Sequence, residues 1–134
     1  GSERRDERLS DFRNPIMKIK AIASDTPQGA ADGLNSFLTD EDIIPYSVSL
    51  TFVPGTRRPS RYIAALHYEP AHNFRKGSVR LDELLDASDL EVSAIERRLK
   101  SSMRPSPGNE VICHDVFITD TGKLMVLVLE LKKP

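Results

Sequence analysis

The sequence predicts an α+β fold in which strands outnumber helices. Several segments alternate between apolar and polar residues, the period of a half-buried strand, and two others carry the signals of a helix start. Near the C-terminal end, residues 124–129 form an unbroken apolar run. Because a strand with one buried face alternates, this run predicts a central strand that is covered on both faces.

Length and composition fit one soluble globular domain, since the chain has 134 residues, of which 39% are apolar and 29% charged. The net charge of −1 argues against a strong overall attraction to nucleic acid or anionic membranes, although a local patch could provide one. The single cysteine, Cys113, excludes an internal disulfide and favours a reducing, cytoplasmic location. We expect no cofactor and no membrane partner, because the sequence has neither a cofactor motif nor an apolar stretch of membrane length.

The first 15 residues are expected to form a flexible charged tail. The first two are typical of a remnant left by an expression tag, and residues 3–14 are mostly charged, with only Leu9 and Phe12 apolar. The single α+β domain is therefore expected at residues 16–134. A short helix that docks through Leu9 and Phe12 is the alternative for the tail.

A strand and a helix are predicted at the start of the domain. Residues 16–23 alternate, with lysines on one face and an apolar opposite face. This apolar face comprises Met17, Ile19, Ala21 and Ala23. Thr26 and Pro27 then give a helix start, with a hydroxyl at the cap and proline at the first helical position. The helical stripe comprises Ala30, Leu34, Phe37 and Leu38. Gly29 and Gly33, four residues apart, would let this helix lie close to the sheet.

A hairpin is predicted next, from the alternating segments 46–52 and 61–69 and the basic loop between them. Leu81, Leu84 and Leu85 indicate a short helix. The capping-box pattern at 88–91 opens a further helix. Its inward residues are predicted to be Val92, Ile95, Leu99 and Met103. A second hairpin, 111–119 with 124–131, ends the chain, and we detect no internal repeat.

The predicted element order is thus β-α-β-β-α-β-β. Its first six elements match the split β-α-β, ferredoxin-like two-layer sandwich, and the seventh adds a C-terminal strand. In the four-stranded form of that arrangement the last strand is an edge, which conflicts with a doubly covered strand at 124–131. Either the strand order differs, or a partner subunit covers the second face. This fold class serves many functions and does not identify one.

The triplet Asp120-Thr121-Gly122 resembles the Asp-Thr-Gly of aspartic proteases, a family in which short chains dimerise to pair two aspartates. Thr119 and Lys123 depart from the apolar residue and the small residue that flank the triplet in that family. We therefore favour a hairpin turn, in which Asp and Gly are used for their backbone tolerance.

A metal site is predicted as a minor alternative at His67, Glu69 and His72. His67 and Glu69 lie two residues apart on a strand and so share a face, and the chain could fold back at Pro70 to bring in His72. Two imidazoles and a carboxylate form a competent zinc set. The competing interpretation is a pair of ordinary surface histidines.

A basic segment spans residues 57–80, with six cations against one acid and interleaved aromatic residues. The six cations are Arg57, Arg58, Arg61, Arg75, Lys76 and Arg80. Such a segment beside an open sheet is typical of a surface for single-stranded nucleic acid or RNA. The alternative is a solvated loop.

Two acidic stretches oppose this basic segment, five acids at 25–42 and six at 82–96, neither containing a lysine or arginine. Complementary patches of this kind favour association with a protein partner or with a second copy of the chain. The predicted function is therefore a non-enzymatic protein-binding or assembly module, which includes self-association. Nucleic-acid binding through the basic segment is the alternative, and a metal-dependent enzyme ranks third.

Overall fold

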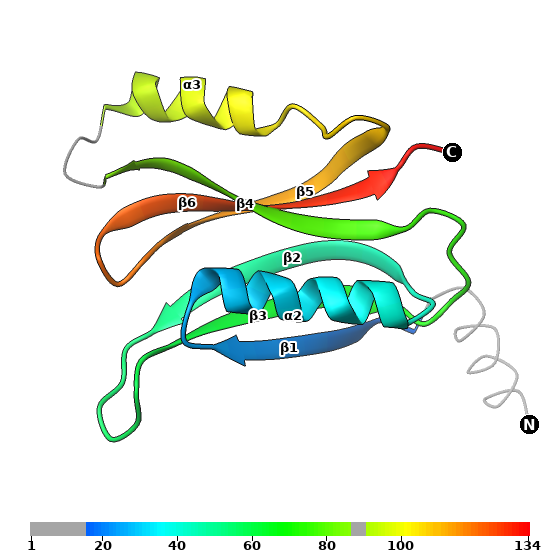
Figure 1. Cartoon of the computed structure of the whole chain (residues 1–134), viewed down its shortest axis with the longest axis horizontal. Coiled ribbons are helices and arrows are strands. Elements are labelled where there is room, and N and C mark those ends of the chain that lie inside the picture. Colours follow the sequence, from blue (N-terminus) through cyan, green and yellow to red (C-terminus); the bar gives the residue numbers. More distant parts are fainter. Residues whose placement is uncertain (1–15, 87–90) are drawn as a thin grey trace, which may run out of the picture.

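The structure is a computed structural model, which describes residues 16–86 and 91–134. Six strands and two helices lie within these ranges (Figure 1). In chain order they are β1 (Lys18–Ser24), α2 (Pro27–Asp40), β2 (Ile44–Val53), β3 (Arg61–Glu69), β4 (Gly77–Asp86), α3 (Val92–Ser102), β5 (Asn109–Ile118) and β6 (Lys123–Lys132). The tail predicted at 1–15 and most of the capping box predicted at 88–91 lie outside the described residues.

The strands divide between two antiparallel sheets, with the orders β1-β3-β2 and β4-β6-β5. The predicted α+β class is confirmed, whereas a single sheet of ferredoxin-like order is not what the structure has. Both sheets have the same connectivity. A strand is followed by a helix and then by a hairpin, and the second strand of the hairpin is the central strand of the sheet. The fold thus repeats a β-α-β-β unit, although the sequence shows no repeat.

The short helix predicted around residues 81–85 is wrong, because this segment lies in strand β4. Val79 and Leu81 pack on one face of the sheet, and Leu84 is buried on the opposite face, as the alternation of a strand requires. A β-bulge between Glu83 and Leu85 interrupts the pairing with β6. The leucines at 81, 84 and 85 have the same spacing as one face of a helix, which explains the wrong prediction.

Strand β6 is central and covered on both faces, which confirms the prediction from its unbroken apolar run. It lies between β4 and β5. Leu127 and Leu129 belong to the core that faces α2, and Val126 and Val128 belong to the cluster under α3. All four are 0% exposed. Helix α3, rather than a partner subunit, therefore covers the second face of this central strand.

The layers follow from these two clusters. As Figure 1 shows, α3 lies over the outer side of sheet β4-β6-β5, while α2 lies beside sheet β1-β3-β2. Ala30, Leu34 and Leu38 of α2 are buried in the core between the two sheets, as predicted. The predicted cap is also present, because the Gly29 N–H donates to Thr26 Oγ1 at 3.0 Å.

Helix α3 packs its side chains on the outer side of β6. Ile95, Leu99 and Met103 lie against the cluster that contains Val126, as predicted. Val92, predicted to face inward, is 70% exposed instead. It is the first residue of the helix, so it lies at the margin of the contact with the sheet.

Candidate protein-binding face

The side of sheet β1-β3-β2 that points away from α2 carries exposed apolar side chains. Ile19 is 63% exposed, Met17 47%, Val53 45% and Tyr46 44%. A surface that gathers large apolar side chains in this way is typical of an interaction site. We call it the outer face. Its middle comprises Ile19, Ala21 and Ala23 of β1, Ile63, Ala65 and His67 of β3, and Ser47, Ser49 and Thr51 of β2.

Strand β1 turns its apolar side to this outer face and its polar side to α2. Lys20 points toward the helix, with its Nζ 5.4 Å from the centre of the Phe37 ring. Ile22, on the same side, packs against the core. A Cβ at Gly33 would lie only 2.6 Å from Ile22 Cγ2, so the close approach of α2 to this side of β1, predicted from the glycine spacing, requires glycine at position 33.

The middle of the outer face contains no aspartate, glutamate, lysine or arginine. Across the sheet, Ala21 lies opposite Ala65, and Ala65 lies opposite Ser49. In the next row Ala23 and Thr51 flank Ile63. The first row therefore carries only small side chains, and the second row adds the larger Ile63 between two small ones.

The two ends of the outer face carry opposite charges. Arg61 begins β3 at one end, beside Val53. Glu69 ends β3 at the other, where its carboxylate accepts a hydrogen bond from Tyr46 Oη at 2.7 Å. That hydrogen bond raises the pKa of Tyr46, because it stabilises the phenol against ionisation.

Beside Arg61 the β2–β3 loop encloses a hollow of about 360 Å³ that continues from the outer face. Val53, Arg57, Arg58, Arg61 and Ile63 are among its lining residues. The loop is held by a 3.0 Å hydrogen bond from the Gly55 N–H to Ser60 Oγ. Three of the six cations of the predicted basic segment are therefore gathered at this hollow.

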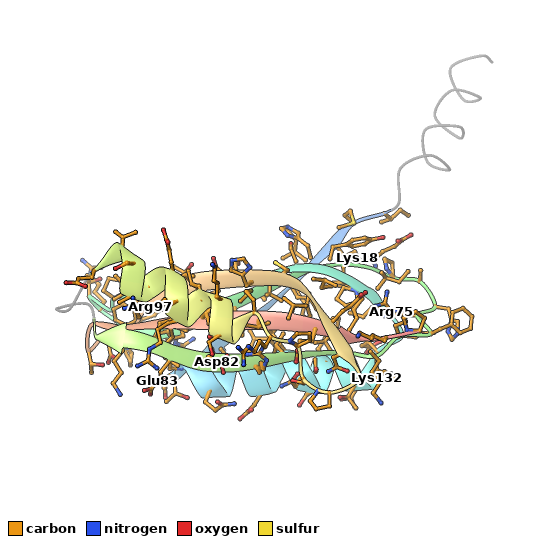
Figure 2. All side chains as sticks on the ribbon, turned by 90° about the horizontal axis from the view of Figure 1, so that it is seen from above. Lys18, Arg75, Asp82, Glu83, Arg97 and Lys132 are labelled. Atoms are coloured by element: carbon orange, nitrogen blue, oxygen red, sulfur yellow. The ribbon has the colours of Figure 1, made fainter. Side chains whose placement is uncertain are left out.

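The other three cations lie elsewhere. Arg75 pairs with Glu110 and donates from Nε to the carbonyl of Lys132 at 2.7 Å, and Figure 2 shows Arg75 and Lys132 at the opposite end of the domain from Glu83 and Arg97. Strand β3 separates this region from the hollow by about 25–30 Å.

Lys76 Nζ lies 3.4 Å from the carbonyl of Thr39, and Arg80 pairs with Asp82 and Glu130. The structure thus uses Arg75, Lys76 and Arg80 in contacts within the domain. It does not join the six cations of the basic segment into one surface.

The predicted metal set is not assembled. His67 Nδ1 lies 3.1 Å from Ser47 Oγ, Glu69 is bonded to Tyr46, and His72 Nδ1 lies 2.6 Å from Asp42 Oδ2. Within residues 16–86 and 91–134 no three His, Cys, Asp or Glu side chains are grouped to hold a metal ion. The Asn73 backbone N–H and the His72 side chain instead lower the pKa of Asp42.

The Asp120-Thr121-Gly122 triplet forms the turn between β5 and β6, as favoured from the sequence. Gly122 adopts φ +84°, and its N–H donates to the Thr119 carbonyl at 3.0 Å. Asp120 is bonded to Tyr62 in both directions, because its carboxylate accepts from Tyr62 Oη at 3.0 Å and its N–H donates to the same oxygen at 2.8 Å. This aspartate therefore ties the turn to strand β3.

Strands β2, β4 and β5 each lie at the edge of a sheet, and each of these edges has a neighbour within the domain. Strands β2 and β5 lie side by side, where the Leu50 N–H donates to Asp115 Oδ2 at 2.8 Å. On the other side of the core, the Asn35 side chain of α2 accepts from the Val79 N–H at 2.8 Å and donates to the Val79 carbonyl at 3.0 Å. Asn35 thus satisfies both backbone groups of Val79 at the edge of β4. Neither contact was predicted from the sequence.

Comparison of the chain with protein families, with curated proteins and with solved structures gives no match. Among the described residues no helix is long and apolar enough to cross a membrane. The outer face and the hollow beside it are therefore the features from which a function can be inferred.

Proposed function

We propose that the chain is a non-enzymatic protein-binding module whose interface is the outer face of sheet β1-β3-β2. The observation that supports this is the orientation of β1, which presents Ile19, Ala21 and Ala23 to solvent while Lys20 points toward α2. A strand buries its apolar side wherever it can, because each Å² of apolar surface removed from water contributes about 25 cal/mol. A partner that covers the outer face supplies the missing burial.

Nucleic-acid binding is the second candidate, supported by the arginines at the hollow. Arg57, Arg58 and Arg61 lie together beside an exposed apolar surface. A phosphate backbone needs several such cations along its path, and binding through them weakens steeply with salt. Because Arg75 and Arg80 are used in contacts within the domain, fewer cations are available to bind nucleic acid than were predicted from the sequence.

Photo-crosslinking tests the proposed interface whichever protein binds to it. A photoreactive amino acid at position 65, in the middle of the outer face, is compared in living cells with the same amino acid at Arg97, on the exposed side of α3. We expect protein adducts at position 65 that are lost in the background of Ile19→Asp, and few adducts at position 97. Equal adducts at both positions, or adducts to RNA only, would exclude the outer face as a protein interface.

A further inference from the structure

We infer that the partner of the outer face is a second copy of this chain, docked face to face with its strands reversed. This inference rests on the proposed function, since it names the occupant of the same surface. The outer face has no aspartate, glutamate, lysine or arginine in its middle, Arg61 at one end and Glu69 at the other. A surface with this arrangement is complementary to itself after a two-fold rotation.

The geometry follows from the strand register. A two-fold axis that crosses the strands at the row of Ala21, Ala65 and Ser49 stacks each strand on its own copy in reverse order. Arg61 of one copy then lies over Glu69 of the other. Facing sheets pack about 10 Å apart, a separation that these two long side chains can bridge.

The same rotation also matches side-chain sizes. Ile19 lies two residues before the axis and Ala23 two residues after it, so the large side chain of one copy faces the small one of the other. Val53, which pairs with Arg61, is likewise brought to the Glu69 end of the other copy, where the Tyr46 hydroxyl reaches the Glu69 carboxylate. Val53 and Tyr46 are both exposed in the single chain, and large-to-small and apolar-to-aromatic contacts are what a packed interface requires.

The area of the face sets the expected strength. Three strands of about seven residues cover about 15 Å by about 25 Å. This footprint is well below the roughly 800 Å² that each partner buries in an interface of standard size. We therefore expect a reversible dimer that forms in the micromolar range, which a single measurement at low concentration would miss.

Sedimentation equilibrium from about 5 to about 500 µM, a span of about 2.7 kcal/mol in association free energy, tests the inference. We expect the wild-type chain to dimerise. Arg61→Glu and Glu69→Arg should each weaken the dimer at least about tenfold, because each places like charges opposite one another. Arg97→Glu, an exposed charge reversal on α3, should have no effect, and circular dichroism checks that all variants remain folded.

Charge-swap complementation decides the orientation. An equimolar mixture of Arg61→Glu with Glu69→Arg restores both opposite-charge pairs, and so does the double variant Arg61→Glu/Glu69→Arg with itself. We expect both to regain the wild-type dissociation constant within about threefold. If the strands were parallel, Arg61 would lie over Arg61 and Glu69 over Glu69, so neither single reversal would weaken the dimer, and the mixture of the two single variants would bind more tightly than the wild type.

Three results would overturn the inference: a monomer at every concentration, a dimer that is insensitive to both charge reversals, or a double variant that does not recover. A monomeric chain that still gives crosslinks from position 65 to a different protein would refute the second copy and leave the proposed protein-binding function standing.

Discussion

Removal of the buried Glu130 carboxylate is expected to destabilise the domain more than removal of the exposed Asp82 carboxylate. Glu130 lies in β6 and is 2% exposed. It accepts hydrogen bonds from the Ser106 N–H at 2.7 Å and the Ser106 hydroxyl at 2.8 Å, and Arg80 Nε lies 3.4 Å away. Arg80 in turn donates to the carbonyls of Ser102 and Arg104. Glu130 thus holds the segment that leads from α3 to β5.

The expected loss of unfolding free energy follows from the groups that the substitution leaves without a partner. Glu130→Ala leaves the Arg80 guanidinium without its buried partner and Ser106 without its acceptor, a loss of about 3–5 kcal/mol. For a domain whose total stability is roughly 5–15 kcal/mol, this lowers the melting temperature by about 10–20 °C. Thermal and urea unfolding followed by circular dichroism measure both quantities.

Asp82→Ala is the matched control, because it also removes a carboxylate from Arg80. Asp82 has a side chain that is 35% exposed, so its ion pair is screened by water and should contribute less than about 1 kcal/mol. If Glu130→Ala costs no more than Asp82→Ala, buried placement does not decide the value of this ion pair and the reasoning is refuted.

The same carboxylate predicts a pH dependence. Burial acts to raise the pKa of Glu130, but the hydrogen bonds from Ser106 and the charge of Arg80 outweigh it and hold the pKa below the ordinary value of 4.5. A carboxylate with a depressed folded-state pKa stabilises the fold fully above its unfolded pKa, and loses this contribution as the pH falls through the folded pKa. As the pH falls below about 4.5, the wild type should therefore lose more stability than Glu130→Gln.

Three further results are expected. Asn35→Ala should cost about 1–3 kcal/mol in urea unfolding, because it leaves the Val79 N–H and carbonyl at the edge of β4 without partners; an unchanged midpoint would show that water replaces them. Gly33→Ala should destabilise the domain in the same assay although alanine favours a helix by about 1 kcal/mol, since its Cβ meets Ile22; a stabilised variant would show that α2 can move away from β1. Tyr62→Phe should cost about 1–2 kcal/mol through the loss of both bonds to the β5–β6 turn, and a loss below about 0.5 kcal/mol would mean that the turn is held without them.

Local signals in the sequence predicted the elements that local forces determine. The cap at Thr26 and the apolar stripe of α2 are both present, because a helix end and a helix face depend on residues within a few positions of one another. The doubly covered β6 was likewise readable from its unbroken apolar run. Strand β4 was predicted to be a helix because its leucines have the spacing of a helical face. A bulged strand also allows this spacing.

Features that depend on distant residues were not predictable. The division of the strands between two sheets depends on which strands hydrogen-bond to each other. The alternation of apolar and polar residues along a strand does not show which strand it pairs with. Alternation in β1 likewise showed an apolar side but not whether that side faces the core, because the direction depends on how the strand packs against α2. The contacts of the cations at 75, 76 and 80 could not be predicted from the sequence, because the partners of their side chains lie 22 or more residues away along the chain. Asp82, which pairs with Arg80, is the exception.

The repeated β-α-β-β unit has a consequence for how the chain unfolds. Each sheet is built from a continuous half of the chain, before and after residues 70–76, so each could pair its strands by itself. The main core is nevertheless shared, with Leu34 and Leu66 from the first half against Leu127 and Leu129 from the second. Neither half can bury these leucines alone, so the two sheets are expected to melt in one transition. A protease cut in the connecting segment should accordingly leave the two fragments bound to each other.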